Sequence, residues 1–462
     1  MTDAWIVGGS LRDELLGRPV RDVDVAIAGD PASPARALAA RVRGPVFRLS
    51  EAFGAWRVID PRAERVYDFA PLQGDSIESD LRRRDFTVNA MARPIELEAL
   101  GAGSEALPAA TPLIDPLGGR ADLDSRTLRV LGAEAYESDP LRTLRLARFA
   151  AELGFAPDPE TERLTQAAAA RVTDAAGERV FAELRRLVIA DGALAGLELA
   201  DRLGVLDAVL PELTALHGVD QSDYHHLDVY DHTLEVLGQQ VELEARLDEL
   251  FGADGARLRG VLAEPLSDEL TRGEALRFAA LVHDIGKPAT RDVRADGRVT
   301  FMGHDALGER MVRDLCRRLR TSDRFARFLA GLTRNHLVLG FLVHERPLDR
   351  AQVYRYLRRT ASVEVEVTLL SCADRLATRG RRADEASAAH LELAAELMTA
   401  ALDWREQGPP RVPVRGDELA EELGIEPGPE LGRLLGELEE AAYVGDAGTR
   451  EQAIALARRL RA

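Results

Sequence analysis

Short apolar runs separated by helical segments fill residues 4–95. Four of these runs have the length and the β-branched or aromatic content of strands: 5–7, 23–27, 57–59 and 66–69. Residues 33–42 have the apolar spacing of a helix, and residues 97–112 are rich in Gly, Ala and Pro, as loops are. The pattern predicts an α+β unit built on a small, mixed and mostly antiparallel sheet.

From residue 140 the apolar positions follow helical spacing almost to the C-terminus. The first of these helices should have Asp139 as its cap and Pro140 at its first position. Leu144 and Phe149 then lie on its apolar face, with arginines opposite. We therefore expect an all-α body to follow the α+β unit.

The composition is that of a globular protein, since 46% of the 462 residues are hydrophobic and 30% are charged. A chain of this length should hold two or more domains. No apolar run approaches the roughly 20 residues that span a bilayer, and no basic start with an apolar stretch predicts a signal peptide. Cys316 and Cys372 have no disulfide or zinc-site spacing. We expect a cytoplasmic protein with no membrane contact.

The net charge of −18 argues against gross, non-specific affinity for nucleic acid, but it leaves room for local binding. Arginines form several clusters, at residues 82–84, 142–148, 185–186 and 317–320. Arginine suits bidentate phosphate contacts. Genomic base composition explains the excess of Arg over Lys equally well, so the clusters alone decide nothing.

Asp22 and Asp24 are two residues apart in a predicted strand, so both carboxylates should point to one side, with Cα atoms roughly 7 Å apart. Oxygen ligands on one face suit Mg²⁺, and paired ions can position both oxygens of a phosphoryl displacement. Upstream, Gly8 and Gly9 allow close approach to a phosphate, and the short helix predicted at 11–16 has an N-terminus that favours an anion. A β-turn with a solvated edge strand is the alternative.

Later segments offer further groups for the same site. Asp68 could add a third carboxylate from a neighbouring strand, or could be a polar residue on a half-exposed strand. The arginines at 82–84 could grip a triphosphate or an RNA backbone, and Asn89 could bond a ribose. The alternative for this segment is a solvated basic turn in which Asp85 caps a helix.

Asp139 and Arg142 are neighbours on a helix surface because they are three residues apart. Together they could read a Watson–Crick edge, since the Asp would accept from an exocyclic amino group and the Arg would donate beside it. C and A carry that amino group, whereas U and G do not offer it there. The alternative is a helix cap with an intrahelical ion pair.

Seven of the nine histidines lie between His217 and His336, and two of them are followed directly by an aspartate, as His283-Asp284 and His304-Asp305. Such a pair in an apolar helical context is costly to bury unless it binds something. Imidazole and carboxylate ligands suit Mn²⁺, Fe²⁺, Ni²⁺ or Zn²⁺, or a site of the Mg²⁺ type. The sequence therefore predicts a divalent metal site.

These motifs, taken in order, resemble a known family. The first 190 or so residues are similar to the catalytic head and neck of class II tRNA nucleotidyltransferases and bacterial poly(A) polymerases, within the polymerase β-like superfamily. The matching motifs are residues 22–24, 83–90, 115–119, 139–142 and 178–179. Residues 224–375 resemble an HD phosphohydrolase domain. We expect domains at 1–135 (head), 136–215 (neck and RNA-binding region), 216–385 (HD) and 386–462 (helical tail).

The resemblance implies roles for individual residues. Asp22, Asp24 and Asp68 would be catalytic, the first two as ligands of Mg²⁺. The residues that would bind the nucleotide are Gly8, Gly9, Arg12, Asp13, Arg83, Arg84, Asp85, Asn89, Asp139, Arg142, Arg145 and Arg148. The HD metal ligands would be His232, His283, Asp284 and Asp374, with His304 and His336 for a second ion. Lys287 could hold a phosphate.

The activity implied is transfer of C or A to the 3′ end of tRNA or another RNA, from CTP or ATP, with no obligate protein partner. Two departures from the family bear on it: Ser138 stands where a Glu is usual, and only some ten residues separate Phe69 from Asp80. Ser138 implies looser base selection. The short connection disfavours complete CCA synthesis and favours a CC-only or A-only enzyme, or one acting on other RNA ends. A metal-dependent phosphohydrolase whose head only recruits RNA, and an inactive RNA-binding scaffold, are the rivals.

Overall fold

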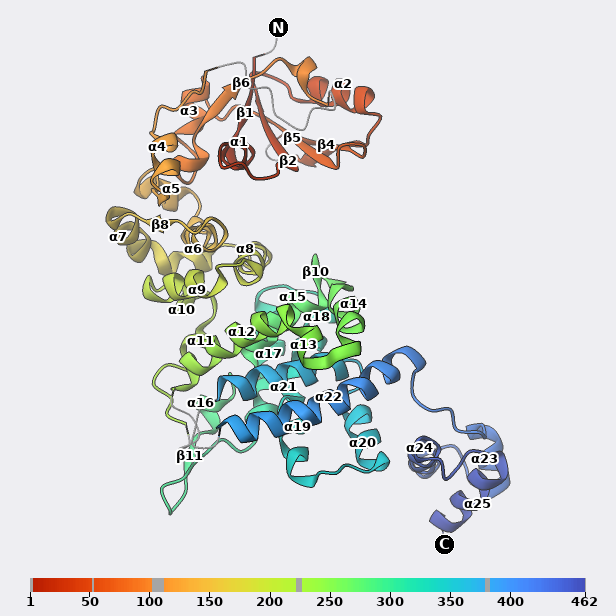
Figure 1. Cartoon of the computed structure of the whole chain (residues 1–462). Helices are drawn as coiled ribbons and strands as arrows, with labels where there is room; N and C mark the ends of the chain where they lie inside the picture. The colour runs from red at the N-terminus through yellow and green to blue at the C-terminus, as the bar shows by residue number, and fades with distance from the viewer. Residues whose placement is uncertain (1–2, 52–53, 102–111, 222–226, 379–382, 462) are drawn as a thin grey trace. The chain divides into compact units, whose positions relative to one another are not determined.

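A mixed sheet and its helices form the first part of the chain, and helices form nearly all of the rest (Figure 1). The structure, a computed structural model, describes residues 3–51, 54–101, 112–221, 227–378 and 383–461. Most of the loop predicted at 97–112 lies outside these residues, as do residues 224–226. Contacts divide the chain into two compact units, Met1–Val209 and Leu210–Ala462.

The sheet of the first unit has six strands in the order β3-β4-β5-β2-β1-β6. Their bounds are β1 Ala4–Val7, β2 Asp22–Ile27, β3 Val46–Ser50, β4 Ala55–Asp60, β5 Arg65–Pro71 and β6 Ala92–Pro94. Only β2 and β5 pair in parallel, which confirms a mixed and mostly antiparallel sheet. The four predicted strands are β1, β2, β4 and β5, whereas the two strands at the edges of the sheet were not predicted.

Helix α2 (Ala32–Val42) covers one face of this sheet and packs against β4 and β5. Arg36 of this helix lies over the ring of Trp56, 4.9 Å from its centroid. Because strand side chains alternate, Asp24 and Asp68 point to the other face. The acidic site therefore lies on the face of the sheet that α2 leaves uncovered.

Two helices begin at residues that differ from the prediction. Helix α1 runs from Gly8 to Leu15, so the two glycines form its first turn instead of a loop before it. Helix α6 (Arg142–Leu153) begins two residues later than predicted. Asp139 is extended, with φ −150° and ψ 96°, because the residue before a proline avoids the helical region.

Among the remaining helices of the first unit, α6 packs against both α8 and α9. Their bounds are α3 Ile77–Leu81, α4 Gly119–Asp124, α5 Ala133–Ser138, α7 Pro159–Ala168, α8 Gly177–Ile189, α9 Ala193–Arg202 and α10 Val205–Val209. Strands β7 (Thr127–Leu128) and β8 (Ala156–Pro157) form a two-stranded sheet. Short 3-10 helices lie at Thr87–Asn89, Leu97–Ala99 and Ala169–Asp174.

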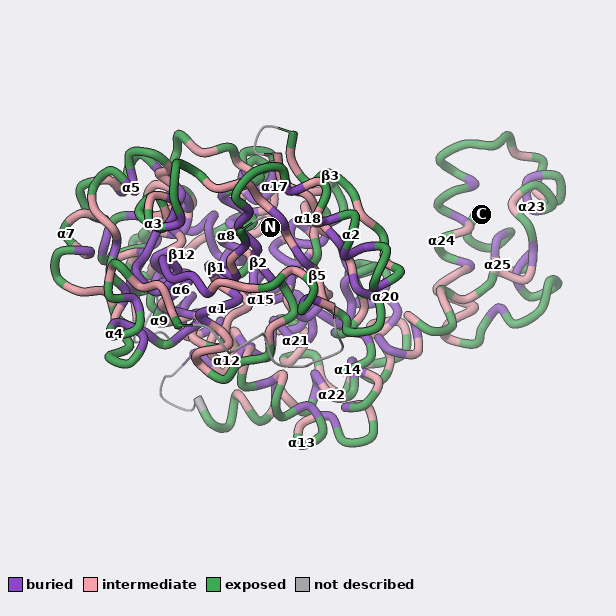
Figure 2. The backbone as a smooth tube through the Cα atoms, turned by 90° about the horizontal axis from the view of Figure 1, so that it is seen from above, coloured by how far each residue is buried: buried purple, intermediate pink, exposed green. Residues whose placement is uncertain are grey.

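The second unit is built around α12, α15 and α21, which pack on one another. The helices that precede the C-terminal segment are α11 Pro211–Thr214, α12 Val229–Ala245, α13 Leu247–Phe251, α14 Gly255–Ala263, α15 Arg272–Val282, α16 Lys287–Thr290, α17 His304–Arg318, α18 Asp323–Asn335, α19 Val338–Leu342, α20 Arg350–Thr360, α21 Glu364–Ala377 and α22 Ala383–Gln407. The hairpins are β9–β10 (Pro265–Ser267, Leu270–Thr271) and β11–β12 (Asp292–Val293, Val299–Thr300), and further 3-10 helices lie at Gly252–Asp254 and Val343–Glu345. Figure 2 shows buried residues gathered in β1 and β2 of the first unit and in α15 and α21 of the second.

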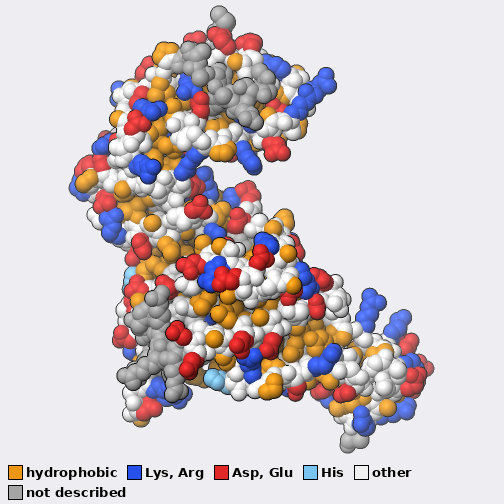
Figure 3. Space-filling view, in the orientation of Figure 1, with side chains coloured by type: hydrophobic (Ala, Val, Ile, Leu, Met, Phe, Trp, Pro, Cys, Tyr) orange, Lys and Arg blue, Asp and Glu red, His pale blue; other side chains and the backbone are white. Residues whose placement is uncertain are grey.

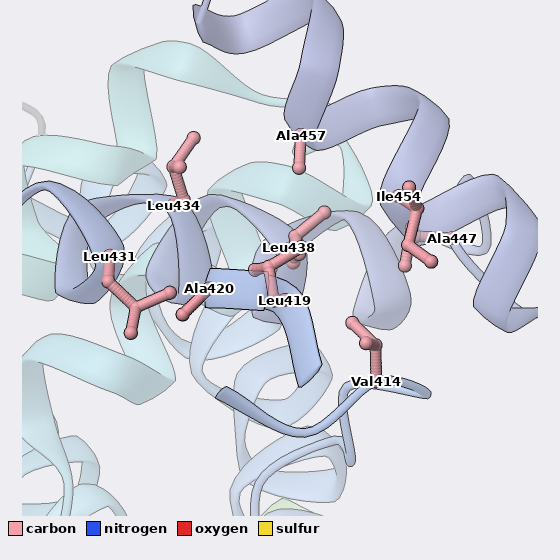
Figure 4. Close-up of a cluster of buried hydrophobic side chains, with 10 residues drawn as sticks. Val414, Leu419, Ala420, Leu431, Leu434, Leu438, Ala447, Ile454 and Ala457 are labelled. Carbon is pink, nitrogen blue, oxygen red and sulfur yellow. The ribbon is translucent and has the colours of Figure 1, made fainter. Parts of the chain in front are cut away.

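The C-terminal helices α23 (Gly416–Leu423), α24 (Pro429–Val444) and α25 (Arg450–Arg461) form a small bundle with its own core (Figure 4). Leu434 and Leu438, one turn apart on α24, are fully buried and meet side chains from the two other helices. No helix among the described residues is both long and apolar enough to cross a membrane. Acidic and basic side chains are interspersed over the visible face of each unit (Figure 3).

We expect Leu434→Ala to weaken this bundle by about 2–4 kcal/mol, because it removes a fully buried side chain and leaves a cavity. Hydrogen exchange of the full chain measures the effect, as faster exchange of α24 amides with no change in α15. The control is Gly436→Ala, at an exposed position of the same helix with open space around it, which should slow that exchange. Unchanged protection of α24 in the Leu434 variant would contradict this account of the core.

Candidate active sites

The first unit contains a cavity of about 570 Å³ that joins the acidic face of the sheet to helix α6. Most of the residues predicted for the metal and nucleotide site line it: Gly8, Gly9, Arg12, Asp13, Asp22, Asp24, Arg83, Arg84, Asp85, Asn89, Arg142, Arg145 and Arg148. Asp68 and Asp139 are the predicted residues that do not line it. Sequence reasoning missed Asp80, Phe149 and Arg186, which also line the cavity.

Three carboxylates occupy neighbouring positions on the uncovered face of the sheet. Asp22 and Asp24 lie on β2, and Asp24 pairs in register with Asp68 on the parallel strand β5. Burial raises the pKa of Asp24 to about 6; Arg84 opposes this shift, while Asp68 and Asp22 add to it. Oxygen donors that repel one another in a partly buried position fit a hard divalent cation such as Mg²⁺.

Gly8 brings backbone directly against this carboxylate. Its φ is +69°, and a Cβ placed on it would lie 2.9 Å from Nη1 of Arg84 and 3.1 Å from Oδ2 of Asp24. The hydroxyl of Ser10 accepts a hydrogen bond from the amide of Asp24 and donates to the carbonyl of Val7. The first turn of α1 is therefore fixed beside the acidic face, as a phosphate site requires.

Asp85 connects the arginine-rich segment to α6 instead of capping a helix. It accepts hydrogen bonds from the Asn89 side chain at 2.9 Å and its neighbour's amide at 2.8 Å, and it pairs with Arg145 at 2.8 Å. Burial raises the pKa of Asp85, but Arg145 and these hydrogen bonds outweigh it and hold the pKa below its usual value. Asn89 also accepts from Arg12 at 2.8 Å, so both ends of its amide are engaged.

Arg145 and Arg148 are held from α8 by a residue that the sequence analysis did not single out. Glu183 lies 3.2 Å from Nε of Arg148 and 3.7 Å from Nε of Arg145. Arg148 is almost fully buried, and burial lowers its pKa to about 10. Burial raises the pKa of Glu183, although the two arginines counter the shift. The arginine face of α6 is therefore part of a buried ionic network that continues into α8.

Asp139 and Arg142 do not form the intrahelical ion pair that was the alternative to base reading. Asp139 pairs with Arg179 of α8 at 2.7 Å. The guanidinium of Arg142 donates to the backbone carbonyls of Arg83, at 2.9 Å, and Arg84, at 3.0 Å. The two side chains therefore have separate partners in this form of the protein.

The second unit gathers the predicted histidines and aspartates into two adjoining groups, His232 with His283 and Asp374, and Asp284 with His304 and His336. Within each group the ligand atoms lie within 4.8 Å of one another. The predicted residues are thus all brought together. The grouping differs from the prediction in one respect, because Asp284 lies with the histidines that were assigned to a second ion.

Backbone carbonyls orient three of these imidazoles. Nδ1 of His283, His304 and His336 each lies 2.7–2.8 Å from the carbonyl oxygen three residues earlier. Nδ1 must therefore be the donor, which leaves Nε2 of the neutral ring as a lone-pair acceptor. Nε2 of His304 and Nε2 of His336 are only 3.2 Å apart, so two lone pairs face each other unless a cation or a proton lies between them.

Charges at this centre are only partly compensated. Nε2 of His283 and Oδ1 of Asp284 are buried without a hydrogen-bond partner. Burial raises the pKa of Asp284, but His283 and Lys287 outweigh it and hold the pKa well below its usual value. Burial lowers the pKa of His336. The neutral imidazole of His336 beside the ionised carboxylate of Asp284, whose Oδ1 is a buried acceptor, is a donor set that suits a divalent transition metal.

The centre opens into a cavity of about 790 Å³ with basic side chains on its walls: Lys287, Arg294, Arg298, Arg334, Arg359 and Arg375. Lys287 donates to Asp284 at 2.6 Å and to Gln221 at 2.7 Å. His390 of α22 also lines the cavity and was not predicted, because no motif surrounds it. A Cβ on Gly286 would lie 2.3 Å from the carbonyl oxygen of His304, so only glycine lets the two ligand-bearing segments meet.

We expect Asp24→Asn to stabilise the metal-free protein at pH 8 by about 1–3 kcal/mol. The native pKa of Asp24, about 6, lies above the roughly 3.9 of an unfolded chain, so the native state binds more protons between these values. Its contribution to the free energy of unfolding is therefore lost as the pH rises from about 4 to about 6.

Urea unfolding in chelator measures this gain at pH 8, and the gain should disappear at the acidic end of the range. Asp124→Asn, at an exposed carboxylate of the same unit, should show neither effect. Equal stability of the Asp24 variant and the parent at pH 8 would contradict the conclusion that the ionised Asp24 carboxylate destabilises the native state.

Family models match most of the chain in three segments. They are the poly A polymerase head domain at residues 4–129, the "probable RNA and SrmB- binding site of polymerase A" at residues 154–216, and the HD domain at residues 229–379. Solved structures with similar folds include a Thermotoga maritima CCA-adding enzyme complexed with tRNA, at 18% identity and a TM-score of 0.60, covering 100% of this chain and 92% of that one. A CCA-adding enzyme with ATP has a TM-score of 0.64 at 19% identity, with the same coverage.

Curated relatives match nearly the whole chain. An A-adding tRNA nucleotidyltransferase of Deinococcus radiodurans is 37% identical over 99% of this chain and 95% of its own length. A CC-adding tRNA nucleotidyltransferase of Thermus thermophilus is 34% identical over 98% and 92%. A multifunctional CCA protein of Ralstonia nicotianae is 35% identical over 77% and 76%. The chain therefore belongs to the tRNA nucleotidyltransferase and poly(A) polymerase family, as a member that carries an HD domain after its RNA-binding segment.

Proposed function

We propose that this protein adds C or A to the 3′ end of tRNA. The RNA 3′-hydroxyl attacks the α-phosphate of CTP or ATP, a new phosphodiester bond forms, and pyrophosphate leaves with the broken bond's electron pair. The observation that carries the proposal is the single cavity that brings Asp22 and Asp24 together with the arginines of α6. Relatives that are A-adding and CC-adding enzymes support it.

Asp22 and Asp24, with Asp68 beside them, would hold Mg²⁺, which when bound makes the hydroxyl easier to deprotonate and neutralises charge on the phosphate. The first turn of α1 and the side chains of Arg83 and Arg84 would bind and orient the triphosphate. Holding hydroxyl and phosphate in line supplies much of the rate. Duplex RNA offers little readable sequence, so the helical body would bind it by backbone and shape.

Base selection would rest on Asp139 and Arg142, which can accept from and donate to the edge shared by C and A. Arg142 is already held by the backbone carbonyls of Arg83, Arg84 and Ala135, and it also donates to Oγ of Ser138, at the position where a Glu is usual in the family. The connection from β5 to α3 is only residues 72–76. A longer flexible connection helps full CCA-adding members of the family to switch from C to A. We propose that the short connection here limits the enzyme to CC addition or to A addition.

A second activity, hydrolysis of phosphate esters, is proposed for the HD domain. Its two ligand groups have buried acceptors without partners, and the cavity above them carries an excess of cationic side chains. Lys287 and the cavity arginines would bind the anionic ester there. The four-part division proposed from sequence, with boundaries after residues 135, 215 and 385, is supported by the placement of the three family matches.

The transfer reaction is tested with tRNAs that end at the discriminator base, at C or at CC, each offered CTP and ATP separately. We expect either incorporation of CTP on the first two ends only, or incorporation of ATP on the CC end only. Replacing Asp22 and Asp24 by Ala should lower incorporation by roughly 10³-fold or more, because the cation site is lost. Asp124→Ala should leave it unchanged. Incorporation that survives the double substitution would rule out this site, and complete CCA synthesis would rule out the restriction to one step.

The hydrolase is tested with p-nitrophenyl phosphate esters in the presence of Mn²⁺, Ni²⁺, Zn²⁺ or Mg²⁺. Replacing His283 and Asp284 by Ala should abolish hydrolysis and metal binding in the second unit while nucleotide transfer continues. The Asp22/Asp24 variant should show the reverse, and Asp314→Ala, at an exposed acid on α17, should change neither. If the His283/Asp284 variant loses both activities and the head variant loses neither, the protein is chiefly a phosphohydrolase.

A further inference from the structure

Asp68, the third carboxylate of the acidic face, is held by an arginine that no motif contains. Both of its oxygens accept hydrogen bonds from Arg57, at 2.7 Å from Nε and 2.7 Å from Nη2. The side chains are 34% and 23% exposed, so the pair is partly shielded from solvent at the site itself. This fork-to-fork geometry is the strongest form of carboxylate pairing that a side chain provides.

The sheet places the pair beside the two other aspartates. Arg57 on β4 lies directly opposite Asp68 on β5, and Asp68 lies in register with Asp24 on β2. Alternation puts all three on one face, together with Asp22. Hydrogen bonding to Asp68 raises the pKa of Arg57, with Asp22 and Asp24 as further contributors. Arg57 is therefore within electrostatic reach of every carboxylate of the candidate metal site.

We propose that Arg57 is a positioning residue that occupies Asp68 in the metal-free head and competes with a divalent cation for it. The inference rests on the proposed function, because it requires a cation at Asp22 and Asp24. Each oxygen of Asp68 already accepts one hydrogen bond from the guanidinium, so a cation must either use a remaining lone pair beside that positive charge or displace a hydrogen bond. Before a cation binds, the positive charge of Arg57 reduces the repulsion among the three neighbouring carboxylates.

Two other accounts of the pair predict different behaviour. In one, Arg57 acts only at long range, so its charge weakens cation binding whether or not Asp68 is present. In the other, the pair is a structural ion pair, so its loss affects stability and leaves cation binding unaltered. A double-mutant cycle over Arg57 and Asp68 separates the three accounts, because it isolates the contribution of the interaction between the two side chains to cation binding.

The experiment is Mn²⁺ titration by calorimetry on the full chain, in a His283→Ala/Asp284→Ala background that removes one candidate ligand from each group of the second unit. We expect Arg57→Ala to bind Mn²⁺ about threefold to tenfold more tightly than the parent. Asp68→Asn should bind more weakly, and adding Arg57→Ala to it should give no further tightening. Arg57→Lys, which keeps the charge but loses the fork, should lie between the parent and Arg57→Ala.

Arg48→Ala is the matched control. Arg48 lies on the neighbouring strand β3 and stacks on Trp56, whose side chain points to the opposite face from Arg57. Arg48→Ala removes the same charge as Arg57→Ala, but from the face of the sheet opposite the carboxylates. It should therefore leave Mn²⁺ affinity unchanged. Equal tightening by Arg57→Ala with and without Asp68 would overturn the proposal in favour of a long-range effect, and no tightening at all would overturn it in favour of a structural pair.

The outcome is distinguishable from failure of the proposed function. If the parent transfers neither C nor A to any tRNA end, the function is wrong, yet the Mn²⁺ cycle still reports whether Arg57 and Asp68 compete with a cation. If transfer occurs, the Mg²⁺ concentration for half-maximal transfer should fall in Arg57→Ala in parallel with the calorimetric constant. Melting temperatures of the variants in chelator confirm that each measurement is made on folded protein.

Discussion

Repulsion between carboxylates gathered on one side of a sheet is the constraint on which the first unit depends. Strand alternation and the parallel pairing of β2 with β5 make Asp22, Asp24 and Asp68 neighbours whether or not a cation is present. Arginine side chains offset this repulsion, since Arg57 pairs with Asp68 and Arg84 lies beside Asp24. The arginines around the site thus stabilise the fold by neutralising the carboxylates, in addition to any contact with phosphate.

The second unit solves a related problem with different groups. Three of its four clustered imidazoles are oriented by the backbone carbonyl three residues earlier, so their Nε2 atoms are aimed before any ligand arrives. Its aspartates are shielded by Lys287 and His232 rather than by arginines. The first unit therefore offers oxygen donors that suit a hard cation, and the second offers imidazole and carboxylate donors that suit a softer one.

Much of this was predictable from sequence because the relevant signals are local. Alternation in a strand placed Asp22 and Asp24 together, and a His-Asp pair in an apolar helix indicated a metal. The features that were missed depend on pairing between distant positions, such as Arg12 with Asn89, or on a helix far along the chain, such as Glu183. The late start of α6 was missed because Pro140 and Leu141 form a turn before the first helical residue, while Asp139 stays extended, as the residue before a proline does.

Arg142 is anchored on the main chain of residues 83 and 84, and not on their side chains. A side-chain partner can be lost by a single substitution, but a peptide oxygen is present whatever residue the codon specifies. The hydrogen bonds that tie the arginine-rich segment to helix α6 would therefore survive substitution of either residue. Changes at residues 83 and 84 can alter the charge of that segment without removing the acceptors that position Arg142.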